Sequence, residues 1–250
     1  MKPEQFALKN EITIDSADAY VVWEEPNRAE TPTLHIGGSG ERYSTLTGVS
    51  WLDDDTFIVN HRSGLRMAIF DQNDLPTPKW TSELDCPTDD IAAKRLDSST
   101  WEICVSGCWS LVYERYQIKK NSLPSNTYQG SRLEALQHVQ KDFSHGVTYD
   151  GNGQLCYAVQ AGMQPRINIG GTTHVLPRPW GARAICHDES RNRYITVAVS
   201  ANPRRAAYGG VQTTLWTLEH NSNKWVCLGL YDNVHSDALG VWNDLIWIPD

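Results

Sequence analysis

Short apolar segments recur along the chain in pairs, and each pair is joined by a turn rich in Asp, Asn or Gly. Each segment covers three to six residues, with continuous or alternating apolar positions, which is typical of short strands. The first segments are Thr47–Leu52, Asp90–Ala93, His145–Tyr149, Ala182–Cys186 and Asp237–Trp242, and the second are Phe57–Val59, Trp101–Val105, Leu155–Val159, Tyr194–Val199 and Leu245–Ile248. The pattern therefore predicts a series of β-hairpins that follow one another along the chain.

Further apolar segments follow most of these hairpins. The predicted third strands are Leu65–Phe70, Leu111–Tyr116, Arg166–Ile169 and Thr213–Thr217, and the predicted fourth strands are Pro78–Leu84, Glu134–Val139, Thr173–Leu176 and Trp225–Gly229. The polar stretch 117–140 is poorly periodic, and its part Ser131–Gln140 has a short helix as the alternative. A repeat of this length, built from hairpins, indicates a β-propeller.

The two ends of the chain complement each other. The last copy stops at Asp250 after two strands, while Ala19–Trp23 and Thr33–Ile36 are strands without inner partners. We therefore expect an all-β fold, a five-bladed β-propeller in a single domain 1–250, with an arm at 1–18 and a closing blade formed by 19–37 plus 237–250. A six-bladed ring is the alternative, with additional strands in 1–18 and 117–140.

Composition narrows the class of partner. The formal net charge of −8 argues against a nucleic-acid partner, because such binding relies on clustered Lys and Arg. The first residues lack the apolar core of a signal peptide, and no apolar run approaches the roughly 20 residues that span a bilayer. We expect a cytoplasmic protein without a membrane partner. Most of the six cysteines lie in apolar segments, so reduced thiols are expected, and no metal or cofactor is predicted.

Three strand openings share a pattern of a polar residue, a small residue and an apolar residue. Thr47-Gly48-Val49, His145-Gly146-Val147 and Asp237-Ala238-Leu239-Gly240 resemble the openings of first strands in the NHL-repeat and SMP-30/gluconolactonase-like propellers. The resemblance covers about residues 44 to 250 and concerns the architecture. It implies that the first-strand openings and the loops between second and third strands share one face around a central channel, where ligands bind.

This implied face carries the candidate site. The predicted catalytic residues are His145, Asp237, His235 and Arg183, and the predicted substrate-binding residues are Trp180, Trp109, Asn60, His61, Arg62, Asp90, Gln160, Arg204 and Arg205. Histidine titrates near neutral pH and suits general acid–base catalysis, whereas guanidinium groups match carboxylate or phosphate oxygens. The structural alternative is that polar residues at strand starts only satisfy backbone groups.

The preferred function is metal-independent lyase, isomerase or cyclase chemistry on a small molecule with an anionic or carbonyl oxygen. The alternatives are a carbohydrate-binding (lectin-like) propeller and a protein-interaction propeller. The resemblance implies that a metal-dependent lactonase of the SMP-30 type would hold its ion with a Glu at the channel mouth. Such a lactonase is less favoured here, because no Glu falls at a first-strand opening. The openings carry Thr, Asp, His, Arg and Asp in turn, so one composite site is favoured over repeated equivalent sites.

Overall fold

The computed structural model describes residues 34–36, 41–43, 46–61, 66–75, 77–84, 88–107, 111–122, 127–137, 143–160, 166–176, 181–200, 212–219, 224–232, 239–242 and 245–247. These residues form β-strands and one short 3₁₀ helix, Glu189–Arg191. Within these ranges, no helix is long and apolar enough to cross a membrane.

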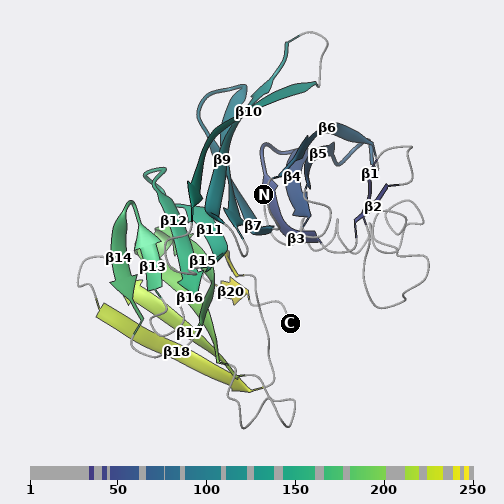
Figure 1. Ribbon diagram of the computed structural model, residues 1–250. Coiled ribbons are helices and arrows are strands. Elements are labelled where there is room, and N and C mark those ends of the chain that lie inside the picture. The colour runs from purple at the N-terminus through teal and green to yellow at the C-terminus, as the bar shows by residue number, and fades with distance from the viewer. Residues whose placement is uncertain are drawn as a thin grey trace. The chain divides into compact units, whose positions relative to one another are not determined.

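Four sheets of four consecutive strands make up most of the described structure (Figure 1). Their strands are β3 (Leu46–Trp51), β4 (Thr56–His61), β5 (Arg66–Asp71) and β6 (Pro78–Glu83); β7 (Thr88–Arg95), β8 (Thr100–Gly107), β9 (Leu111–Lys120) and β10 (Tyr128–Gln137); β11 (Phe143–Tyr149), β12 (Leu155–Gln160), β13 (Arg166–Ile169) and β14 (Thr172–Val175); and β15 (Gly181–Asp188), β16 (Arg193–Ser200), β17 (Gln212–Glu219) and β18 (Lys224–Asp232). Two hairpins complete the set: β1 (Leu34–Ile36) with β2 (Glu41–Tyr43), and β19 (Gly240–Trp242) with β20 (Leu245–Trp247). The fold is an all-β propeller whose blades are these sheets.

The blade count differs from the prediction. The described residues form four four-stranded blades, not five or six. The hairpin β19–β20 lies where the sequence predicts it, and β1 matches the predicted strand at 33–36, but each belongs to a separate two-stranded sheet. Closure of a ring by strands from both ends stays a prediction, and segments 1–18 and 19–23 lie outside the described residues. The helix alternative for Ser131–Gln140 is wrong as far as residue 137, because β10 continues to there.

Contacts divide the chain into two compact units. The first comprises Met1–Ile103 and Arg115–Leu133, and the second comprises Cys104–Glu114 and Glu134–Asp250. Strands β8, β9 and β10 contribute residues to both. The prediction of a single domain stays a prediction.

In the first unit, the first strands β3 and β7 of two successive blades are neighbours. Gly48 lies against Asp90 and Ile91, so an added Cβ would come within 2.7 Å of the Ile91 backbone nitrogen. Trp101 is 1% exposed, and its indole Nε1 donates to the carbonyl oxygen of Leu52 at 2.8 Å. A glycine contact and a buried indole therefore hold these two blades together.

We expect the variant Trp101→Phe to lower the free energy of unfolding by about 1 to 3 kcal/mol, because the buried Leu52 carbonyl loses its indole donor. Urea unfolding would measure the change. An unchanged unfolding midpoint would show that the hydrogen bond does not contribute to the stability of the pair of blades.

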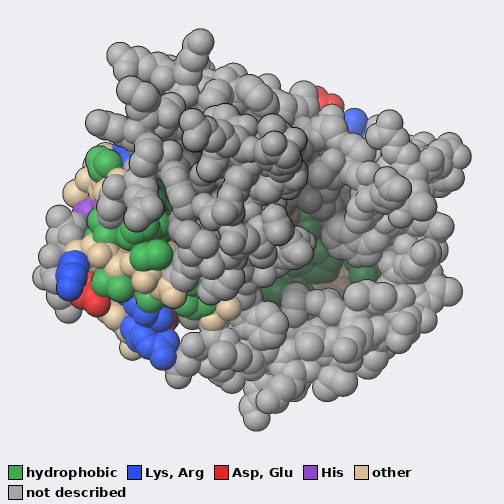
Figure 2. Space-filling view, turned by 90° about the horizontal axis from the view of Figure 1, so that it is seen from below, with side chains coloured by type: hydrophobic (Ala, Val, Ile, Leu, Met, Phe, Trp, Pro, Cys, Tyr) green, Lys and Arg blue, Asp and Glu red, His purple; other side chains and the backbone are tan. Residues whose placement is uncertain are grey.

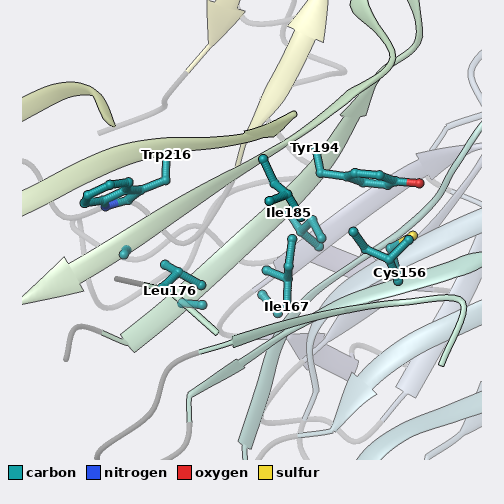
Figure 3. Packing of buried hydrophobic residues seen from close by; sticks show 11 residues of the cluster. Cys156, Ile167, Leu176, Ile185, Tyr194 and Trp216 are labelled. Atoms are coloured by element: carbon teal, nitrogen blue, oxygen red, sulfur yellow. The ribbon is translucent and has the colours of Figure 1, made fainter. Parts of the chain in front are cut away.

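In the second unit, the core lies between the third and fourth blades (Figure 3). Cys156 and Ile167 from the third blade pack with Ile185, Tyr194 and Trp216 from the fourth, and all are buried. The first strands β11 and β15 are neighbours here as well. Apolar residues on facing sheets thus bury each other, which is the main stabilising effect for stacked blades.

A carboxylate occupies the turn between first and second strands in each of the four blades. Asp53, Asp97 and Asp150 each accept a backbone N–H from the residue two positions later. This Asx-type bond explains why Asp recurs at the turns. Asp150 also accepts the hydroxyl of Tyr194 at 2.9 Å, and this bond ties the turn of the third blade to the fourth.

Asp188 fills the corresponding place in the fourth blade and is 1% exposed. Burial on its own would raise the pKa of this carboxyl, but hydrogen bonds from Ser190, Arg193 and Arg191 outweigh burial and lower the pKa to about 2. The ionised form is therefore the one that stabilises the fold.

From this shift we expect an acid-dependent loss of stability. Because the folded pKa lies below the ordinary value of 3.8, the contribution is complete above that value and is lost as the pH falls toward about 2. It amounts to about 2 kcal/mol. Asp188→Asn should lack this decrease in the free energy of unfolding when urea unfolding is measured at a series of pH values. If the variant and the parent protein lose the same stability at low pH, the assignment to Asp188 is contradicted.

Candidate functional site

Three first strands begin with a β-bulge at equivalent positions. In β3 the register passes from Leu46 to Gly48, in β11 from Ser144 to Gly146, and in β15 from Ala182 to Ala184. The residues left without a cross-strand partner are Thr47, His145 and Arg183. A bulge turns the extra side chain out of the strand's regular alternation, and bulges are common beside active sites.

In the second unit the bulges of β11 and β15 lie against each other. A Cβ added at Gly146 would lie 2.7 Å from the Arg183 carbonyl oxygen and from the Cα of Ala184. Only glycine allows the two strands to approach this closely. Gly146, the small residue of the polar–small–apolar pattern, therefore allows the strand openings that carry His145 and Arg183 to lie close together.

His145 and Arg183 are in direct contact. The Nη1 atom of Arg183 lies 3.2 Å from both ring nitrogens of His145. The histidine is 7% exposed, whereas the arginine is half-buried. Both were predicted as catalytic residues, and the structure brings them together.

Hydroxyl groups fix the backbone at these two bulges. Ser106 on β8 donates to the carbonyl oxygen of His145 at 3.0 Å, and Thr196 on β16 donates to the carbonyl oxygen of Ala184 at 2.7 Å. Both hydroxyl residues are fully buried. Neither residue is among the site residues predicted from the sequence, and Thr196 lies within an apolar run that gives no signal of this role.

Ser144, beside His145, has a hydroxyl that is buried and has no hydrogen-bond partner among the described residues. A buried hydroxyl without a partner is energetically costly, and a functional role is one of the explanations for it. Its position next to the bulge agrees with a site at this strand opening.

In the first unit, the bulge residue Thr47 belongs to a polar cluster with Asn60 and Thr88. Asn60 Nδ2 donates to both threonine hydroxyls, at 3.1 and 2.8 Å, and Thr47 donates to the Thr88 carbonyl oxygen at 2.8 Å. Asn60 is fully buried, and its Oδ1 has no hydrogen-bond partner in the part of the chain that is described. The structure thus shows Asn60 supporting the bulge, and its role in substrate binding stays a prediction.

The other predicted site residues fall into two groups. Asp90 is on β7, where its Oδ1 accepts the N–H of Ile91 at 2.8 Å, and His61 and Gln160 end strands β4 and β12. The side chains of His61 and Gln160 are not described. The remaining predicted site residues lie outside the described residues: Asp237, His235, Trp180, Trp109, Arg62, Arg204 and Arg205.

Two of the cysteines, Cys156 and Cys186, are poor candidates for nucleophiles. Burial first, and then the nearby carboxylate of Asp150 or Asp188, raises the pKa of Cys156 and of Cys186 to about 12. At neutral pH both thiols are therefore protonated. In the described ranges, no three side chains of His, Cys, Asp or Glu are grouped as metal ligands.

Exposed apolar side chains bear on the alternative of a protein-interaction surface. Figure 2 shows hydrophobic side chains at the surface next to Lys and Arg side chains. The most exposed described ones, Val49, Leu133 and Val175, belong to three different blades and are 58%, 49% and 48% exposed. Single exposed apolar residues are ordinary, so they do not favour that alternative.

No family model matches the chain, and no curated protein matches its sequence. Among solved structures, a protein from Lactobacillus plantarum is 10% identical, with a TM-score of 0.50 over 86% of this chain and 64% of that chain. A suggested 6-phosphogluconolactonase from Bacteroides uniformis is 9% identical, with a TM-score of 0.51 over 86% of this chain and 68% of that chain.

A streptogramin B lyase is 13% identical over 81% of this chain and 75% of that chain, with a TM-score of 0.43. The aligned part of this chain spans about two-thirds of the length of the first two structures. At these identities the likeness concerns the fold alone. The chain has a β-propeller fold that resembles the gluconolactonase and NHL group.

Proposed function

We propose that the protein is an enzyme that performs acid–base chemistry on a small molecule carrying an anionic or carbonyl oxygen. His145 transfers the proton and Arg183 holds the oxygen. The observation that carries this proposal is the contact between these side chains, both presented by β-bulges on neighbouring first strands. Polar residues that merely satisfied strand starts would not need the two side chains to meet.

The chemistry follows from the two groups. An imidazole accepts or donates a proton near neutral pH, and a guanidinium stabilises negative charge that develops on a neighbouring oxygen. Removal of a proton next to a carbonyl creates such a charge. Lyase, isomerase and cyclase reactions can all begin with this step, and Asp237 and His235 would orient the histidine.

The rest of the proposed site lies in segments outside the described residues. Arg204 and Arg205 would add positive charge for the anionic group, and Trp180 and Trp109 would form an apolar wall. Lactone hydrolysis is the second candidate, because a protein of this fold from Bacteroides uniformis is a suggested 6-phosphogluconolactonase and lactone opening also places charge on a carbonyl oxygen.

The test is a turnover screen in D₂O followed by NMR. Carbonyl compounds with carboxylate or phosphate groups are incubated with the protein, and a parallel set contains sugar lactones. Proton abstraction incorporates deuterium at the carbon next to the carbonyl, whereas lactone hydrolysis opens the ring without it. Deuterium incorporation supports the proposal, ring opening alone supports the second candidate, and neither reaction in the full set contradicts both.

A further inference from the structure

The contact between Arg183 and His145 has an unusual geometry. A donor that hydrogen-bonds in the plane of an imidazole lies close to one ring nitrogen and far from the other. Here Nη1 of Arg183 is equally distant, at 3.2 Å, from Nδ1 and Nε2. Equal distances place the guanidinium nitrogen over the face of the ring, between the two nitrogens, and arginine commonly stacks in this way.

This position makes the arginine a cover for the histidine. His145 is 7% exposed and Arg183 is half-buried with its Nε buried, so Arg183 is the more exposed residue of the two. The histidine backbone is fixed by Ser106 and by the close approach at Gly146, whereas the arginine side chain is long and has several rotatable bonds. Of the two groups, the guanidinium is therefore the one that can move.

We propose that Arg183 is an oxyanion-operated cover: it lies on the His145 ring in the ligand-free protein and turns onto a carboxylate or phosphate group of the substrate when that group binds. This inference rests on the proposed function and deepens it, because it names an oxyanion as the recognised group. It also couples recognition to chemistry, since the ring becomes accessible only when an oxyanion is present.

The relative strengths of the two contacts support the exchange. A guanidinium binds a carboxylate or phosphate through two charge-assisted hydrogen bonds, which are roughly twice as strong as hydrogen bonds between neutral groups. Stacking on an imidazole is a weaker interaction. The difference gives the oxyanion a preference for the uncovered state, which is what a population shift requires.

The test measures access to the His145 ring without any substrate. Diethyl pyrocarbonate modifies accessible neutral imidazoles, and peptide mass mapping assigns the rate to each of the 8 histidines. We expect inorganic phosphate to accelerate modification of His145 by at least about threefold, with saturation, relative to chloride at matched ionic strength. His174, on the outer strand β14, is the internal reference and should not respond.

Two variants separate a specific effect from a general one. In Arg183→Met, modification of His145 should be fast from the start and independent of phosphate. Arg132→Met, which removes a positive charge from an exposed position on β10, should behave like the parent protein. If Arg183→Met does not fold, the modification rate of His145 in the parent protein, measured at increasing phosphate concentration, still tests the proposed cover.

A His145 rate that phosphate leaves unchanged or lowers would overturn the cover. That result is distinguishable from failure of the proposed function. If a His145 variant loses turnover but phosphate does not change the modification rate of His145 in the parent protein, the proposed function stands and the proposed cover is wrong. If phosphate accelerates modification of His145 but a His145 variant keeps its turnover, the proposed cover stands and the catalytic role of His145 is wrong.

Discussion

Replacing His145 with glutamine is expected to lower turnover by roughly a hundred- to ten-thousandfold on the substrate that the screen identifies. Glutamine keeps hydrogen-bonding capacity and a similar size but cannot transfer a proton. The fold should survive, because the contacts that hold this bulge use the backbone: Ser106 binds the His145 carbonyl oxygen, and Gly146 supports the strand contact.

The matched control is His174→Gln. His174 lies on β14, the fourth strand of the same blade, whereas His145 lies at the opening of its first strand. The control should retain the parent turnover and show the same stability. Steady-state kinetics measures the turnover of both variants. Equal turnover in His145→Gln and His174→Gln would show that His145 does not take part in the reaction.

Steady-state kinetics of an Arg183 variant tests the role of the guanidinium. Arg183→Lys keeps the charge but loses the planar pair of donors. If the guanidinium holds charge that develops only in the transition state, both kcat and kcat/KM fall, whereas loss of simple binding raises KM alone. Because Arg183 is proposed both to bind the oxyanion of the substrate and to hold the developing charge, we expect a higher KM together with a lower kcat.

The second large effect concerns stability. Gly146→Ala should lower the free energy of unfolding by about 3 kcal/mol, at the upper end of overpacking effects. The new Cβ would meet backbone atoms of the neighbouring strand: the Arg183 carbonyl oxygen and the Ala184 Cα at 2.7 Å, and the Ile185 nitrogen at 2.9 Å. Backbone atoms of a paired strand cannot move aside cheaply, so β11 and β15 must separate.

Gly151→Ala is the control for this substitution. Gly151 is exposed in the turn of the same blade, and the nearest atom to an added Cβ is the carboxylate oxygen of Glu189 at 3.3 Å, which belongs to a flexible side chain. We expect a change within about 0.5 kcal/mol. Urea unfolding of both variants makes the comparison, and equal effects would show that the strand contact is not tight.

Most strands could be predicted because their signals are local. Apolar residues bounded by Asp, Asn and Gly turns identify each hairpin, and the Asx bonds of Asp53, Asp97 and Asp150 show the physical reason for those turns. Strand β10 was harder, since its outer position leaves residues 129–134 exposed and removes the alternation that distinguishes a strand from a helix.

The number of blades could not be predicted in the same way. It depends on which distant segments pair, and a local pattern of apolar residues does not set that pairing. The terminal hairpins illustrate the difficulty, because β19–β20 forms where its sequence predicts a hairpin but remains a separate two-stranded sheet.

Residue type and position at strand openings indicate His145 and Arg183 as candidates, and the structure shows that their side chains are in contact. The geometry of that contact could not be predicted from the sequence. The bulges that present these side chains result from cross-strand register, which residue type does not specify. Asn60 was chosen as a polar residue at a strand end, yet its side chain is fully buried and hydrogen-bonded to Thr47 and Thr88.

In the proposed site, one small molecule engages His145 and Arg183 together. A crystal structure of the protein soaked with a broad mixture of metabolites tests it most directly. We expect density for a molecule whose carboxylate or phosphate lies on the Arg183 guanidinium and whose reactive part faces the His145 ring. Ligands repeated at equivalent places in several blades, with the His145–Arg183 contact undisturbed, would contradict it and indicate a lectin-like binder.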